Sequence, residues 1–124
     1  MSYDQALASR IRKYFENHLN VEEKKMFGGL AFMVNGHMCV GANDHRLMAR
    51  VGPQSYMHVL EDNMYATIMD FTGKPLKGFL YMEPEATDTD EELFKWIELC
   101  ENFVLTLPPK TQAPQQLPKM AAKG

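Results

Sequence analysis

The side chains with the clearest chemical potential lie between Gly28 and His45, a segment that holds two histidines and one cysteine. His37 and Cys39 are two residues apart, which on a strand places them on one face, and His45 follows in a predicted turn. Imidazole and thiolate groups are zinc ligands. However, no CxxC or HxxxH pair is present, and a fourth ligand would have to come from His58 or a distant carboxylate. The sequence therefore predicts no metal centre and no cofactor.

Cys39 is also the best candidate for a catalytic nucleophile, because His37 or His45 could accept its proton. No third orienting group and no oxyanion-binding turn accompanies it. A thiol on a strand is more often a small buried apolar group than a reactive one. The sequence accordingly predicts no catalytic residue, and an enzyme based on Cys39 and His37 is the least favoured interpretation.

Anion binding is the remaining chemical option. The pair Gly28-Gly29 belongs to neither of the glycine-rich phosphate motifs GxGxxG and GxxxxGK[ST], and it interrupts a strand pattern. We therefore expect it to mark a β-bulge or the close approach of another backbone. Arg50, Lys74 and Lys77, near the Gly73 loop, form a candidate site for a small anionic or phosphate-bearing ligand. A solvated turn explains the same lysines equally well.

The hairpin turn Asn35-Gly36 is the clearest structural signal, because a type I′ turn needs positive φ at both central positions. Alternating apolar residues around it predict three antiparallel strands that begin at Met26 and end at Val51. If Met33 and Met48 face away from the helices, they leave an apolar sheet face that could support a homodimer.

Three helices and two further strands complete the predicted architecture. Ser2 and Gln5 have the spacing of a capping box for a first helix over 3–18. Pro53 fits the first turn of a short second helix. Strands are expected near 67–71 and 78–82, with a loop at 72–76 between them. Asp88 or Thr89 caps a long third helix with buried positions at helical spacing.

The predicted order is α-β-β-β-α-β-β-α, a two-layer α+β fold with helices on one face of a five-stranded antiparallel sheet. Residues 1–108 form the predicted domain, and the polar, proline-bearing segment 109–124 is expected to be a flexible tail. The residues expected to serve this fold as structural motifs are Gly28, Gly29, Asn35, Gly36, Gly73 and Gly78.

Composition restricts the class of function. All 16 acidic residues lie at or before Glu101 but only ten of the 13 basic residues do, so this part carries a formal charge of −6. That charge opposes nucleic-acid phosphates, and direct nucleic-acid binding is not expected. No apolar run of about 18 residues exists to span a membrane. With no export signal at the start and only two cysteines, we expect a cytoplasmic protein with reduced thiols.

Negative charge is densest from Glu83 to Glu101, where eight acidic residues accompany the single base Lys95. Several of them lie at the start of the third predicted helix, where the helix dipole favours negative charge. Helix capping and solubility explain this segment, and a partner with a basic surface is the alternative explanation.

Four separated blocks carry a resemblance to a known family, in the order KKMFGGLAFMVNGHMCVG, LMARVGP, MDFTGKPLKGFLYM and LPPK. Together they resemble the N-terminal domain of the TfoX/Sxy family of bacterial competence regulators. The resemblance implies a two-layer α+β fold with an antiparallel sheet and a tendency to dimerise. It also implies a role in transcription regulation, since better-known members act as co-activators beside a separate DNA-bound regulator. It supplies no catalytic residues.

We therefore expect a non-enzymatic, homodimeric interaction domain that modulates transcription through contacts with a protein partner. The alternative is a small-molecule or phosphate-binding module that uses Arg50, Lys74 and Lys77.

Overall fold

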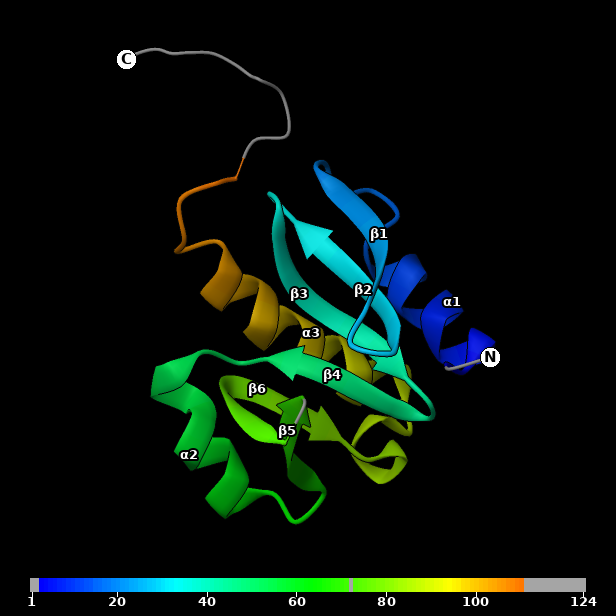
Figure 1. Ribbon diagram of the computed structural model, residues 1–124. Helices are drawn as coiled ribbons and strands as arrows, with labels where there is room; N and C mark the ends of the chain where they lie inside the picture. The colour runs from blue at the N-terminus through cyan, green and yellow to red at the C-terminus, as the bar shows by residue number, and fades with distance from the viewer. Residues whose placement is uncertain (1–2, 72, 111–124) are drawn as a thin grey trace.

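The computed structural model describes residues 3–71 and 73–110, which form one antiparallel sheet and three helices (Figure 1). The elements in chain order are α1 (Gln5–Tyr14), β1 (Val21–Met26), β2 (Gly29–Val34), β3 (His37–Asn43), β4 (Arg46–Arg50), α2 (Pro53–Asp62), β5 (Ala66–Phe71), β6 (Lys74–Met82), the 3-10 turn η1 (Pro84–Thr87) and α3 (Asp90–Val104). Within the described residues the sheet has six strands, in the order β1-β2-β3-β4-β6-β5. The α+β class with an antiparallel sheet is confirmed.

The predicted number of five strands is wrong by one, because Val21–Met26 forms the edge strand β1 and pairs with β2. Its central residues Glu22, Glu23, Lys24 and Lys25 are all exposed. A strand that is polar on both faces has no apolar alternation to reveal it. Charged side chains on an edge strand also discourage pairing with another chain, which explains why such a sequence suits this position.

Two tight turns organise the meander. Asn35 and Gly36 have φ values of 53° and 84°, and Val34 pairs with His37, so the predicted two-residue hairpin turn is confirmed. Gly28 is the second residue of a similar turn between β1 and β2, and not part of a bulge. Gly29 lies so close to β3 that a Cβ added there would be 2.1 Å from a backbone oxygen, which confirms the predicted close approach of another backbone.

A bulge does occur, but in β3. Met33 pairs with Met38 and Phe32 with Val40, which leaves Cys39 without a partner across the ladder. Cys39 consequently points to the same buried cluster as Val40.

The helix boundaries are partly as predicted. Helix α1 is shorter than the predicted range 3–18, and its N-cap is Asp4, whose carboxylate accepts a hydrogen bond from the Ala6 amide. Ser2, the predicted cap, lies outside the described residues. Pro53 begins α2, and Thr89 caps α3 in a reciprocal capping box with Glu92, so both of these predictions are confirmed.

All three helices pack on one face of the sheet, as predicted. Their buried side chains join those of the strands in one core cluster, with α1 and α3 behind β2, β3 and β4 and α2 at the end that carries β5 and β6 (Figure 1). Leu93, Ile97, Cys100 and Val104 of α3 are fully buried there at the predicted helical spacing.

The opposite face of the sheet is apolar but not exposed, which corrects the prediction for Met33 and Met48. Both are buried, in a second cluster completed by Ala31, Met38, Met69 and Tyr81. The cause is the coiling of the sheet. Phe27 lies in the turn after β1, and Phe79 lies in β6, which is not a neighbour of β1 in the sheet. Coiling brings the centroids of their rings to 6.2 Å from each other. This face therefore gives no argument for a homodimer.

The last hairpin is tighter than predicted, since β6 begins at Lys74 inside the expected loop 72–76. Residue 72 lies outside the described residues. Gly73 and Gly78 both have positive φ, and the Gly78 carbonyl accepts a hydrogen bond from the amide of Gly52, just before α2.

The segment after α3 returns to the β2–β3 hairpin. The amide of Lys110 donates to the carbonyl of Asn35 (2.7 Å), and Nε2 of His37 donates to the carbonyl of Pro108 (2.6 Å). A Cβ at Gly36 would collide with Lys110. The LPPK block and the Asn35-Gly36 turn are thus parts of one contact. Residues 111–124, for which a flexible tail is predicted, lie outside the described part of the chain.

Candidate interaction surface

The two residues of β3 with predicted chemical roles, His37 and Cys39, have structural roles in the fold. Cys39 is buried, and burial followed by the charge of Glu101 raises the pKa of its thiol far above the ordinary value, so the thiol stays protonated at neutral pH. His37 holds the Pro108 carbonyl. Among the residues that the structure describes, no group of three or more histidine, cysteine, aspartate or glutamate side chains could hold a metal ion.

Arg50 is half-buried within the fold. It donates to the carbonyl of Met38 (3.3 Å), and its guanidinium carbon lies 5.1 Å and 5.7 Å from the ring centroids of Phe79 and Phe103. Burial lowers the pKa of this guanidinium. Lys74 and Lys77 are exposed on β6. The two hollows described next have other linings, and an anion site at Arg50, Lys74 and Lys77 stays a prediction.

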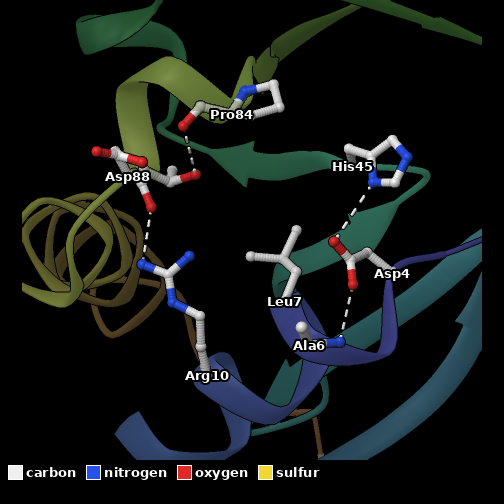
Figure 2. Close-up of a pocket in the computed structure, with 8 residues that line it drawn as sticks. Asp4, Ala6, Leu7, Arg10, His45, Pro84 and Asp88 are labelled. Atoms are coloured by element: carbon white, nitrogen blue, oxygen red, sulfur yellow. Dashed lines mark hydrogen bonds and ion pairs between the residues drawn. The ribbon is translucent and has the colours of Figure 1, made fainter.

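The first hollow, here called the Asp4 hollow, lies between the start of α1, the β3–β4 turn and η1 (Figure 2). Its lining residues are Asp4, Ala6, Leu7, Arg10, His45, Pro84, Thr87 and Asp88. One oxygen of Asp4 accepts the Ala6 amide at 2.8 Å, and the other lies 3.3 Å from Nδ1 of His45. These contacts hold the pKa of Asp4 below its ordinary value, with the amide of Ala6 as the largest cause.

Arg10 closes the other side of the Asp4 hollow. Its Nη2 donates to the carbonyl of Thr87 at 2.7 Å, and its Nε donates to a carboxylate oxygen of Asp90 at 2.9 Å. Figure 2 shows the first of these bonds spanning the hollow from α1 to η1. Arg10 therefore ties α1 to the start of α3.

The second hollow, here called the Trp96 hollow, lies between the end of α2, the start of β5, η1 and α3. Its lining residues are Asp62, Asn63, Met64, Tyr65, Glu85, Ala86, Glu92, Lys95 and Trp96. The side chain of Asn63 accepts the amide of Tyr65 (2.9 Å), which fixes the turn after α2. Nε1 of Trp96 donates to the carbonyl of Ala86 (3.0 Å), which fixes the indole ring against η1.

The charges around the Trp96 hollow are mostly negative. Asp62 forms an ion pair with His58, at 3.2 Å on the exposed surface of α2, and Glu92 serves the capping box of α3. The carboxylate of Glu85 has no hydrogen bond or ion pair within the described part of the chain. Lys95 is the only base of the lining, and its Nζ lies 5.5 Å from the centroid of the Trp96 ring.

Exposed apolar side chains gather at the same end of the molecule. Of six large hydrophobic residues that are exposed in the described chain, four belong to the short segment from α2 to β5: Met57, Met64, Tyr65 and Ile68. Met64 is 85% exposed. Two of the four, Met64 and Tyr65, line the Trp96 hollow. The hollow therefore combines an aromatic ring, exposed apolar groups and an excess of carboxylates.

Sequence reasoning did not identify this surface. The acidic segment from Glu83 to Glu101 pointed to a basic partner, but Trp96 within it was not singled out. It is the only tryptophan of the chain, and a single tryptophan within an acidic segment is the sequence signal that could have found the hollow. In the structure its side chain is half-buried.

The fold and the surface together define a small α+β domain whose described cysteines are both buried and which presents the exposed apolar side chains of Met64 and Tyr65 at an acidic hollow. A family model described as the TfoX N-terminal domain matches residues 13–104, and the chain belongs to this family. No curated protein sequence matches the chain. The match covers every residue that lines the Trp96 hollow, whereas Asp4 and Arg10 precede it.

In the part of the chain that the structure describes, no helix is both long enough and apolar enough to cross a membrane.

Proposed function

We propose that this protein is a non-enzymatic regulatory domain of the TfoX N-terminal type, which modulates transcription in the cytoplasm through contacts with another protein. The observation that carries the proposal is the pair of exposed apolar side chains, Met64 and Tyr65, that line the Trp96 hollow. Large exposed apolar groups beside a hollow are typical of protein interaction sites. The family supports a regulatory role for the domain, and the buried thiols argue against nucleophilic catalysis.

The proposed mode of action is indirect, because the part of the chain up to Glu101 carries a formal charge of −6. Such a surface repels the phosphates of duplex DNA. Titration of a fluorescent duplex with the full chain at physiological salt should give no binding tighter than about 10⁻⁴ M, the weak end of non-specific affinity. Tight binding with a steep dependence on salt would refute the indirect mode.

A homodimer remains part of the proposal, on the strength of the family resemblance. Sedimentation velocity over a wide range of protein concentrations tests it directly. A single species with the mass of one chain, 14.2 kDa, at every concentration would remove the dimer from the proposal.

The contact surface itself is tested by a matched pair of substitutions. Met64 and Leu19 are both 85% exposed, but Met64 borders the Trp96 hollow and Leu19 lies in the loop between α1 and β1. The affinity-tagged full chain is isolated from its own cells as wild type, as Met64→Asn and as Leu19→Asn, which remove an apolar side chain without adding a charge. A protein that accompanies wild type and Leu19→Asn but is lost with Met64→Asn is the expected result. Equal recovery with all three chains would show that the surface is not used.

A further inference from the structure

We propose that the Trp96 hollow binds a lysine or arginine side chain from a basic, partly apolar segment of the partner protein. This proposal rests on the proposed function, because it names the chemistry of the partner at the same surface. It is carried by the indole ring of Trp96, by the carboxylates beside the ring and by the apolar side chains at the border of the hollow.

The ring is already held in place to receive a cation. Its Nε1 donates to the carbonyl of Ala86, so the indole does not have to be ordered when a ligand arrives. Tryptophan is the aromatic residue that binds cations best at its face. The chain itself shows this use of the ring, since Nζ of Lys95 lies 5.5 Å from its centroid.

The carboxylates of the lining are largely free of ion pairs within the described residues, since only Asp62 forms one. Asp62, Glu85 and Glu92 face only one base, Lys95, across the lining. Glu85 has no ionic partner in the described chain, so an incoming ammonium or guanidinium group can pair with it without breaking an existing contact. The ion pair that Asp62 makes with His58, outside the lining, is exposed and therefore weak.

The apolar border determines what must accompany the cation. Met64 and Tyr65 are exposed beside the hollow, and a flexible thioether adapts to side chains of different shape. An apolar residue next to the lysine or arginine of the segment would cover them. A free amine would gain only the electrostatic part of the binding.

Other classes of ligand fit this lining less well. Phosphate-bearing ligands are repelled by the same three carboxylates. A divalent metal ion needs several ligands around one point, and the described residues hold no group of three or more histidine, cysteine, aspartate or glutamate side chains that could provide them.

The test uses the fluorescence of the full chain, because Trp96 is its only tryptophan and reports on this hollow alone. The probe is a six-residue peptide of alternating lysine and leucine, and the comparison peptide alternates glutamate and leucine. We expect a saturable change in tryptophan emission with the basic peptide and none with the acidic one. Glu85→Lys should weaken binding of the basic peptide about tenfold, because it reverses a charge beside the bound cation.

The matched control is Glu98→Lys, which makes the same change of net charge on an exposed residue of α3 that does not line the hollow. Its affinity for the basic peptide should stay within about twofold of wild type. Equal weakening by both substitutions would show general attraction to an acidic protein and would overturn the proposal. A basic peptide that leaves the tryptophan emission unchanged would overturn it as well.

The two proposals fail in different ways. If Met64→Asn loses the cellular partner while Glu85→Lys keeps both the partner and the peptide, the interaction domain stands and the cation site is wrong. If neither substitution affects the partner, the proposed function at this surface is wrong, whatever the peptide does.

Discussion

The Asp4 hollow and the Trp96 hollow differ in what their polar groups already do. At the Asp4 hollow both carboxylate oxygens of Asp4 have partners, and Arg10 bonds to Thr87 and Asp90. At the Trp96 hollow the carboxylate of Glu85 has no partner in the described chain, and the neighbouring apolar side chains face solvent. Asp88 of the Asp4 hollow also has no side-chain partner in the described chain, but only the Trp96 hollow combines such a carboxylate with large exposed apolar side chains.

This difference shows that shape alone does not identify a binding surface. Donors and acceptors that already bond to one another across a depression join elements of the fold, since a ligand would have to break those bonds before making its own. At the Asp4 hollow, Arg10 joins α1 to η1 in this way (Figure 2), and its bond with Asp90 joins α1 to α3. The following predictions separate the joining role of one hollow from the binding role of the other.

Arg10→Ala should have the largest effect on stability. It removes a charged donor from the carbonyl of Thr87 and the partner of Asp90, and should lower the free energy of unfolding by about 2 kcal/mol. Urea unfolding measures the change. The slope of the free energy of unfolding against urea concentration should be the same as in wild type, which would show that only the stability has changed.

Arg12→Ala is the control for that measurement, because Arg12 lies on the same helix but pairs with Glu23 on the exposed edge strand β1. It should lower the free energy of unfolding by less than about 1 kcal/mol. If Arg10→Ala instead leaves stability unchanged and reduces recovery of the cellular partner, the Asp4 hollow is a binding surface and the comparison is reversed.

Asp4→Ala should have an intermediate effect, a loss of about 1 kcal/mol at neutral pH, because it removes the N-cap of α1. The contacts of Asp4 lower its pKa in the folded state. Its charge therefore stabilises the fold fully above the unfolded pKa of about 4, and this contribution is lost as the pH falls through the lower folded value. The gap in melting temperature between wild type and Asp4→Ala should be constant near neutrality and narrow below about pH 4.

Glu85→Ala at the Trp96 hollow is the contrasting variant. With no hydrogen bond to lose in the described chain, it should change the free energy of unfolding by no more than about 0.5 kcal/mol at neutral pH. A larger loss would mean that Glu85 belongs to the scaffold.

The sequence predicted those parts of the fold that local patterns specify. The Asn35-Gly36 turn, the start of α2 at Pro53 and the Thr89 cap all depend on neighbouring residues. Strand β1 was missed because its residues are polar on both faces. Burial of Met33 and Met48 was missed because it depends on the coiling of the whole sheet, which no local spacing encodes.

The Trp96 hollow was missed for a similar reason. Asp62 ends α2, Tyr65 precedes β5, Glu85 lies in η1 and Trp96 in α3. The lining is therefore assembled from segments separated in the sequence. Only the excess of acidic residues was visible beforehand. The apolar part of the surface depends on which methionines are exposed. Met64 is exposed and Met69 is buried, and only the tertiary structure shows this difference between two identical side chains.

Met64→Ser should have the smallest effect on stability. It is therefore the clearest test of whether the Trp96 hollow, unlike the Asp4 hollow, binds a partner without supporting the fold. Met64 and Leu19 are equally exposed, so replacing either by serine should change the free energy of unfolding by no more than about 0.5 kcal/mol. Binding of the lysine-leucine peptide should nevertheless weaken about fivefold with Met64→Ser, because part of an apolar contact at the hollow is lost. Leu19→Ser should bind the peptide as wild type does. If Met64→Ser instead destabilises the domain as much as Arg10→Ala, then Met64 supports the fold, and the two hollows do not differ in role.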